Sequence, residues 1–181
     1  MAGVPESDLV SRLRDGDRDA VEQAYVAHHA AVRGFARKLV GDVDTAEDLV
    51  HDTFVALPRA IRGFRGEASL RSFLIGVAIN HAKRHIRSAM RRRKATERFA
   101  EVPRESEVHA DVALERSRLA ERLSRALDDL PIDQRVVFVL CEAEQRTSVE
   151  VAAIVGAPEG TVRTRLMHAK KKLREALEGH V

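Results

Sequence analysis

Apolar residues recur at steps of three and four along most of this chain, and this spacing predicts helices rather than strands. The first such run lies at 21–39, and a second begins near Asp44. Asp is a common helix-capping residue, and Glu47 follows it three positions later. We expect Pro58 to kink or end this second helix. A third begins after Ser69, another capping type. Residues 1–94 therefore predict one compact helical unit. The first run comprises Val21, Ala24, Tyr25, His28, Val32, Phe35, Ala36 and Leu39.

The composition agrees with an all-α fold. Hydrophobic residues make up 44% of the 181 residues, but aromatic residues make up only 4% and Trp is absent, which disfavours an all-β sandwich or barrel. The single Cys141 excludes an internal disulfide and a Cys-rich zinc site, as fits a reducing compartment. No apolar run approaches the roughly 20 residues that span a bilayer, and an acidic, polar segment rather than a leader follows Met1. We therefore expect a cytoplasmic protein without membrane insertion.

The second half of the chain predicts a separate helical unit. Residues 95–111 carry mixed charge around Pro103 and few large apolar side chains, which is typical of a flexible linker. We therefore expect an all-α protein of two small helical domains, residues 1–94 and residues 112–181, joined by this flexible linker.

The C-terminal unit has the order of a helix-turn-helix. Ser148 can cap a short helix that stops at Gly156, and a turn containing Pro158 leads into a longer helix from Glu159. A short helix, a turn with Gly and a longer helix are the parts of this DNA-binding motif. The inward stripe of the last helix is Val162, Leu166, Ala169 and Leu173.

A formal net charge of +3 conceals an uneven distribution of charge. Residues 1–57 carry 6 Lys or Arg against 11 Asp or Glu, whereas residues 59–94 carry 11 against the single Glu67. Residues 163–174 carry 6 basic residues and no acid. Two separate basic blocks indicate two contacts with a polyanion such as DNA.

Both basic blocks offer side chains suited to nucleic acid. The second helix of a helix-turn-helix lies in the major groove, where Arg reads guanine and Thr or Lys fixes register, although a basic C-terminal helix can also be a solvated face. The loop at 64–69 offers an aromatic ring and a guanidinium, which can hold an unstacked base. On the loop alone, the simpler interpretation is that Phe64 anchors the core and Gly66 makes a turn.

Other candidate sites carry less. His81 and His85 have a spacing that can bind zinc, and His28 and His29 are neighbours, but no Cys or Glu supports a metal site. We expect Cys141 to fill the core. A Gly-rich phosphate loop, a nucleophile elbow and a paired-carboxylate arrangement are all missing from the sequence, so we expect no enzyme, no catalytic residues and no cofactor.

Three sequence runs in order resemble the extracytoplasmic-function sigma factors of bacterial RNA polymerase. They are DTAEDLVHDTF at 44–54, FRGEASLRSFL at 64–74 with its continuation at 78–80, and the stretch from Leu130-Pro131 to PEGTVRTRL at 158–166. The resemblance covers nearly the whole chain, and three motifs in order are more specific than any one of them. It implies an alternative sigma factor that binds core RNA polymerase, through the β′ clamp helices and the β flap, and directs promoter-specific initiation.

The resemblance also implies a role for each domain. The second helix would dock on the β′ clamp helices, the loop and third helix would recognise and melt the minus-ten element, and the last helix would read the minus-thirty-five element. It further implies promoter DNA and an anti-sigma factor as partners, and a monomer when free. The implied polymerase-binding residues are Glu47, Asp48, Leu49, Asp52, Thr53 and Phe54. Those implied for the minus-ten element are Phe64, Arg65, Gly66, Ser69, Asn80, Lys83, Arg84 and Arg87. Those implied for the minus-thirty-five element are Glu159, Gly160, Thr161, Arg163, Thr164, Arg165, His168 and Lys171.

The sequence departs from the family pattern at three places. Phe73 stands where the family often has Trp, and Leu57-Pro58 stands where a second aromatic residue is common, which predicts weak or narrowly promoter-specific strand opening. The segment 144–146 is more polar than the pattern leads us to expect.

Two other functions fit parts of the sequence. A stand-alone helix-turn-helix regulator could dimerise through residues 1–94 and bind a palindromic operator without polymerase. An adaptor or enzyme could carry the basic blocks incidentally, which predicts no salt-dependent DNA binding.

Overall fold

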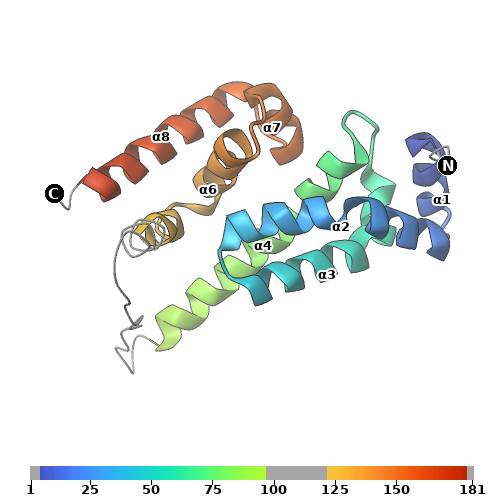
Figure 1. Cartoon of the computed structure of the whole chain (residues 1–181), viewed down its shortest axis with the longest axis horizontal. Coiled ribbons are helices and arrows are strands. Elements are labelled where there is room, and N and C mark those ends of the chain that lie inside the picture. The colour runs from blue at the N-terminus through green and yellow to red at the C-terminus, as the bar shows by residue number, and fades with distance from the viewer. Residues whose placement is uncertain (1–4, 97–121, 179–181) are drawn as a thin grey trace, which may run out of the picture.

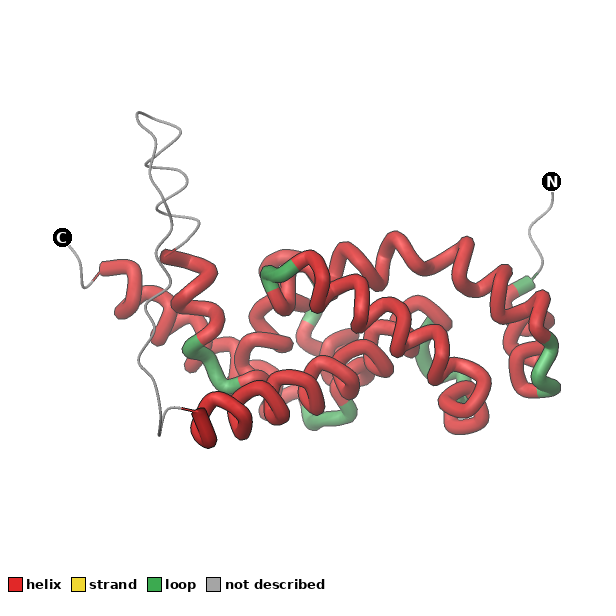
Figure 2. The backbone as a smooth tube through the Cα atoms, turned by 90° about the horizontal axis from the view of Figure 1, so that it is seen from below, coloured by secondary structure: helices red, strands yellow, loops and turns green. Residues whose placement is uncertain are grey.

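The computed structural model describes residues 5–96 and 122–178, with side chains given in α4 only as far as Ser88. All regular structure in these two ranges is helical, so the predicted all-α fold is confirmed (Figures 1 and 2). The first domain contains α1 (Glu6–Arg14), α2 (Arg18–Val40), α3 (Val43–Ala60), the 3-10 turn η1 (Ile61–Gly63) and α4 (Leu70–Thr96). The second contains a helical segment at 122–128, α6 (Ile132–Phe138), the π-helical turn η2 (Val139–Ala143), α7 (Ser148–Val155) and α8 (Glu159–Glu178).

The ends of α2 and α3 follow from their capping residues. Gly41 ends α2 with a φ of 73°, in the left-handed region that glycine adopts without strain. Asp42 caps α3, because its carboxylate accepts a hydrogen bond from the Thr45 N–H at 2.8 Å. Asp44, the predicted cap, instead lies in the first turn. Pro58 lies inside α3, which continues to Ala60 and then tightens into η1, so of the two predicted outcomes, a kink or an end, the helix does not end at Pro58.

The helix-turn-helix of the second domain is present, with one change in its cap. Thr147, rather than Ser148, forms a reciprocal capping box with Glu150: its hydroxyl accepts from the Glu150 N–H, and its own N–H donates to the Glu150 carboxylate at 2.8 Å. Gly156 ends α7 in the left-handed conformation, as expected. The predicted inward stripe of α8 is confirmed, since Val162, Ala169 and Leu173 are buried and Leu166 is half-buried.

The two domains share a hydrophobic core, which the expectation of two loosely tethered units did not include. One cluster of buried residues combines α2, α3 and α4 of the first domain with α6, η2, α7 and α8 of the second. Figure 1 shows α6 and α7 beside α2 and α4. The main contributors are Phe35, Leu39, Ile75, Ile79, Val136, Leu140, Val151 and Val162. Residues 97–111 of the predicted linker and 112–121 of the second domain lie outside the described residues.

A second cluster, within the first domain alone, joins α1, α2, α3 and α4. Its fully buried members include Leu13, Leu57, Ile61, Leu70 and Leu74, and each such side chain contributes about 1.5–3 kcal/mol relative to exposure. This cluster holds the loop at 64–69 against η1 and the start of α4. Among the described helices, none is both long and apolar enough to cross a membrane.

Candidate nucleic-acid interface

The outward face of α8, the second helix of the helix-turn-helix, carries exposed polar and basic side chains. The Arg163 side chain is 71% exposed and is held by Glu159 at 2.5 Å, while Glu159 also accepts a hydrogen bond from the Ser148 hydroxyl at 2.7 Å. These two hydrogen bonds, first that from Ser148 and then that from Arg163, lower the pKa of Glu159. Glu159 is therefore an ionised residue that orients Arg163, and its own carboxylate is poorly suited to contact phosphate.

The other residues implied for the minus-thirty-five element divide into two groups. Exposed ones are Gly160, Thr164, His168 and Lys171, of which Thr164 donates from its hydroxyl to the Gly160 carbonyl at 3.0 Å. Thr161 is half-buried, and Arg165 turns toward Asp133 of α6, 3.5 Å away. In this conformation, the exposed face of α8 therefore presents only some of the residues implied for the minus-thirty-five element.

The loop before α4 matches the simpler of its two interpretations. Phe64 is 8% exposed, its ring lies 5.0 Å from that of Phe73, and its carbonyl accepts a hydrogen bond from Arg14 at 2.5 Å. Gly66 has a φ of 75° and makes the turn. Ser69 caps α4, because its hydroxyl oxygen accepts from the Ser72 N–H at 3.2 Å. Phe64 is therefore a core anchor in this conformation, and only a small part of it reaches the surface, where it lines a pocket with Arg65 and Phe73.

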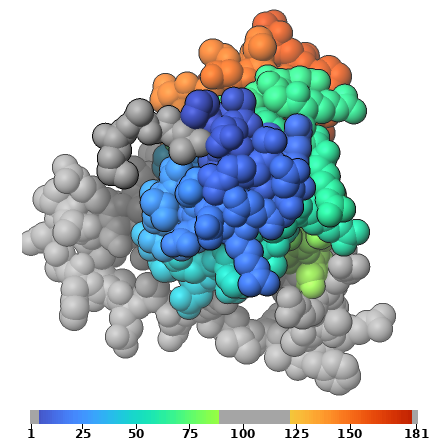
Figure 3. All heavy atoms as spheres, turned by 90° about the vertical axis from the view of Figure 1, so that its right-hand side faces the viewer, coloured from blue at the N-terminus to red at the C-terminus, as the bar shows by residue number. Residues whose placement is uncertain are grey.

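Phe73 is the more exposed of the two aromatic residues beside this loop. It is half-buried and lines a pocket of about 250 Å³ together with Arg65 and Asn80. Ala153 and Ile154 of α7 close the other side of this pocket. Figure 3 shows the loop and the start of α4, in green, directly beside the second domain, in orange. The sequence carried a signal for this residue, since Phe73 stands where the family often has Trp.

The exposed side of α4 continues this surface with basic groups. Asn80, Arg84 and Arg87 are exposed, as the basic stripe predicted. Lys83 instead contacts Asp133 of α6, with Nζ 2.7 Å from the carboxylate. This hydrogen bond is the main cause of the lowered pKa of Asp133, to which the charges of Lys83, Arg165 and Arg87 add.

The implied polymerase-binding set mixes buried and exposed residues of α3. Leu49, Thr53 and Phe54 lie in the core, where the Thr53 hydroxyl donates to the Leu49 carbonyl at 2.6 Å. Those three side chains stabilise α3 and do not face solvent. Glu47 is half-buried and pairs with Arg33 at 2.9 Å, whereas Asp48 and Asp52 are exposed.

An apolar groove of about 510 Å³ lies between α2 and α3, and Val55 on its wall also borders the surface that contains Asp52. Tyr25 is 40% exposed and Val55 is 65% exposed on its walls, and Pro58 closes one end. The Tyr25 ring meets the edge of Phe54 with centroids 5.0 Å apart, which fixes its orientation. Sequence periodicity does not identify Tyr25 and Val55 as surface residues, because Tyr25 falls in the predicted apolar stripe of its helix and Val55 is an apolar residue type.

The residues considered above for metal or redox chemistry, His28, His29, His81, His85 and Cys141, are all half-buried. Nowhere in the described ranges do three or more His, Cys, Asp or Glu side chains gather as metal ligands would. Burial is the main cause of the lowered pKa of His81, whose Nδ1 lies 3.7 Å from the Asp52 carboxylate. Burial likewise raises the pKa of the Cys141 thiol, which packs against the shared core.

Comparison with known proteins agrees with this arrangement. Residues 24–92 match the Sigma-70 region 2 family, and residues 120–173 match the Sigma-70 region 4 family. The chain thus has both helical regions of a sigma-70-type factor, in order.

The chain belongs to the extracytoplasmic-function sigma factors and is an alternative sigma factor that directs transcription initiation. The RNA polymerase sigma-H factor of Pseudomonas aeruginosa is 27% identical, over 96% of this chain and 94% of that protein. The ECF RNA polymerase sigma-E factor of Escherichia coli K12 is 29% identical, over 96% of this chain and 92% of that protein.

Solved structures agree with the fold. The sigma factor RpoE in complex with the anti-sigma factor NepR, from Bartonella quintana, superposes with a TM-score of 0.62 at 25% identity, covering 88% of this chain and 98% of that one. CnrH in complex with the cytosolic domain of CnrY also gives a TM-score of 0.62, at 23% identity and over 97% of this chain and 99% of that one, which supports the fold alone.

Proposed function

We propose that this chain binds core RNA polymerase through the exposed face of α2 and α3, recognises the minus-ten element with α4 and the loop before it, and reads the minus-thirty-five element with α8. The main support for this proposal is that acidic and basic side chains lie on separate exposed helix faces. On α3 the exposed acids are Asp44, Asp48 and Asp52, whereas α4 exposes Arg84 and Arg87 and α8 exposes Arg163 and Lys171. A polyanion is attracted to the second and third of these faces and repelled by the first.

The polymerase-binding face combines acids with an apolar groove. Asp48 and Asp52 can pair with basic side chains of a partner, while the groove lined by Tyr25 and Val55 can accept its apolar side chains. A buried apolar centre with charged residues around it is the usual arrangement of a protein interface. The implied docking helix is therefore retained, with the contact residues shifted to its exposed side.

The minus-ten surface combines a half-exposed ring with a basic stripe. Phe73 and Asn80 lie in a pocket with Arg65, which supports capture of one unstacked base there. Arg84 and Arg87 extend from it along α4 and would follow the phosphate backbone of the same strand. Strand melting in this proposal uses binding energy, with no catalytic group.

A regulator of this chain would be an anti-sigma factor. A structural relative was solved in complex with one, at 25% identity to this chain. We infer the same class of partner here, acting by sequestration of the chain from polymerase.

Co-elution with bacterial core RNA polymerase on a sizing column tests the proposal. We expect the wild-type chain to co-elute and the charge reversal Asp48→Lys/Asp52→Lys to abolish binding. The matched control is Asp8→Lys/Asp15→Lys, which reverses two exposed acids of the α1 region and leaves α3 intact. Free chain that dimerises and shifts an operator duplex without polymerase would instead establish the stand-alone regulator.

A further inference from the structure

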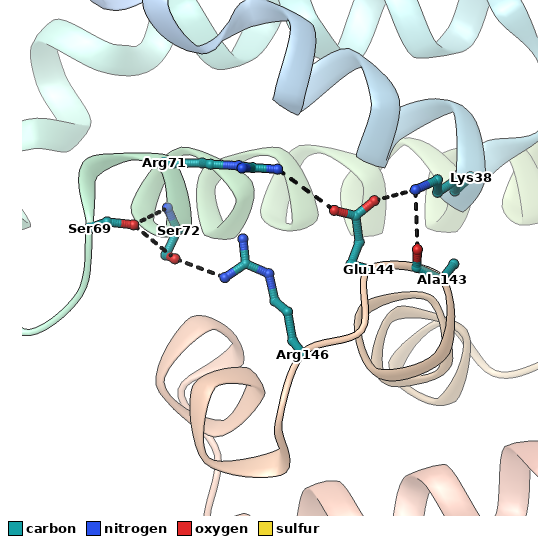
Figure 4. A network of polar contacts seen from close by, with 7 residues as sticks. All are labelled: Lys38, Ser69, Arg71, Ser72, Ala143, Glu144 and Arg146. Carbon is teal, nitrogen blue, oxygen red and sulfur yellow. Dashed lines mark hydrogen bonds and ion pairs between the residues drawn. The ribbon is translucent and has the colours of Figure 1, made fainter.

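The turn formed by Glu144, Gln145 and Arg146 is the polar segment for which the proposed function has no use. It follows the π-helical turn η2, and Gln145 has a φ of 54°, which is uncommon for a residue other than glycine. This geometry directs the side chains on both sides of Gln145 toward the first domain (Figure 4).

Glu144 and Arg146 connect the two domains directly. The Glu144 carboxylate lies 2.6 Å from Lys38 of α2 and 3.9 Å from Arg71 of α4, and its side chain is only 10% exposed. Arg146 donates to the Ser72 hydroxyl at 3.1 Å, and Lys38 donates to the Ala143 carbonyl at 3.2 Å. The partial burial of Glu144 protects these ion pairs from the screening that weakens surface pairs.

Asp133 makes a second connection, at the other end of the shared core. It lies 2.7 Å from Lys83 of α4 and 3.5 Å from Arg165 of α8. One carboxylate therefore pairs with a cation from each of the two helices assigned to DNA. Its chemistry resembles that of a phosphate group, since both are anions that accept hydrogen bonds from Lys and Arg.

The closed arrangement conflicts with simultaneous reading of both promoter elements. The elements are, by their names, about 25 base pairs apart, which is about 80 Å along a duplex. Lys83 and Arg165 share one carboxylate here, so their side chains lie far closer than that. α7 also closes one side of the pocket that contains Phe73.

We propose that Glu144 and Asp133 form an interdomain clasp that holds the free chain closed and masks Lys83 from DNA. The masking rests on the DNA contacts of the proposed function, whereas the closure rests on the interdomain contacts alone. A DNA phosphate competes with Asp133 for Lys83, so promoter engagement and opening of the clasp favour each other.

Neutralising the clasp tests the proposal on the full chain. We expect Asp133→Asn/Glu144→Gln to increase the radius of gyration in small-angle X-ray scattering, measured at fixed ionic strength. If only a fraction of the chain is open, its measured affinity for DNA is the affinity of the open form multiplied by that fraction. We therefore also expect Asp133→Asn/Glu144→Gln to bind a labelled random-sequence duplex about tenfold more tightly than the wild-type chain. The matched control is Glu175→Gln/Glu178→Gln, which removes two exposed acids of α8 and no interdomain contact.

A second, uncharged variant separates opening from charge. A Cβ at Gly76 of α4 would lie 3.2 Å from the Ile154 carbonyl oxygen of α7, so the larger side chain of Gly76→Leu has to separate the domains. Leu is a better helix former than Gly, which keeps α4 itself stable. We expect the same increase in radius of gyration, with helicity by circular dichroism unchanged.

Three results would overturn the clasp. They are an unchanged radius of gyration in both variants, an equal affinity gain in the Glu175→Gln/Glu178→Gln control, and opening without any gain in duplex affinity. Co-elution of the wild-type chain with core polymerase is scored separately. If the wild-type chain does not co-elute with core polymerase, that result contradicts the proposed function. It does not decide the clasp, because scattering measures closure of the free chain without polymerase.

Discussion

Arg135 of α6 donates a hydrogen bond across the domain boundary to the carbonyl of Leu39, in the last turn of α2, at 3.1 Å. Arg135 is 5% exposed and also pairs with Asp128 at 2.9 Å. A buried guanidinium with partners in both domains ties the end of α2 to the start of α6.

Replacement of that side chain should weaken the whole chain. Arg135→Ala leaves the Leu39 carbonyl without this donor, and we expect the free energy of unfolding to fall by about 1.5–3 kcal/mol. Urea denaturation followed by circular dichroism measures it. The control Arg174→Ala changes an exposed arginine of α8, and an equal loss there would contradict the special role of Arg135.

The cap of α7 offers a direct comparison of two adjacent residues. Thr147→Ala removes the capping box with Glu150, so we expect a loss of about 1 kcal/mol of unfolding free energy. Ser148→Ala removes only the hydrogen bond to Glu159 and should cost less. Thermal denaturation of both variants decides, and a larger loss from Ser148→Ala would restore Ser148 as the cap.

The two phenylalanines beside the minus-ten pocket should behave differently. Phe73→Ala removes a half-exposed ring and should reduce open-complex formation, by the loss of about 1–3 kcal/mol of stacking, while the fold persists. Phe64→Ala empties a core position and should lower unfolding free energy by about 3–5 kcal/mol. Permanganate reactivity of promoter thymines and urea denaturation measure the two effects. Equal loss of melting in both, with equal stability, would contradict the distinction.

The exposed side chains of α8 should separate base reading from phosphate contact. Arg163→Ala should cost about 1–3 kcal/mol at one promoter position and relax specificity there. Lys171→Ala should weaken binding to all promoter variants equally and reduce the salt slope by about 1. Fluorescence anisotropy of holoenzyme on a set of promoter variants makes the comparison. Uniform loss from Arg163→Ala would make it a phosphate contact.

Asp133 also makes the closed form dependent on pH. Its pKa in the folded chain is lowered from the ordinary 3.8, chiefly by the hydrogen bond from Lys83. The stabilising contribution is therefore complete above pH 3.8 and is lost as the pH falls through the lowered value. We expect the radius of gyration of the wild-type chain to rise over that acidic range, and Asp133→Asn to reduce the change. A chain that closes further on acidification would contradict the assignment.

Periodicity predicted the helices and the buried stripe of α8 well, because a helix buries residues on one face whatever it packs against. It could not identify the partner of each face. Val136 and Leu140 are apolar in any helical interpretation, but their burial against Phe35 and Ile79 depends on a contact between distant parts of the chain.

The family resemblance could not separate buried from exposed residues among the implied site residues, for a different reason. A motif such as that at 44–54 contains every residue of a helix, so Leu49 and Thr53 of the core were grouped with the exposed Asp48 and Asp52. The turn at 144–146 could be recognised as unusually polar, but its contacts with Lys38 and Ser72 required the structure.

The shared core between the domains gives their separation a thermal signature. Opening exposes apolar side chains such as Ile75 and Leu140 to water, which raises the heat capacity. Because apolar burial is driven by entropy near room temperature, moderate warming strengthens this part of the contact, while screening by salt weakens the ionic part. Temperature and ionic strength therefore act on the closed chain in opposite directions, and any partner that opens the chain must compensate for the apolar surface that opening exposes.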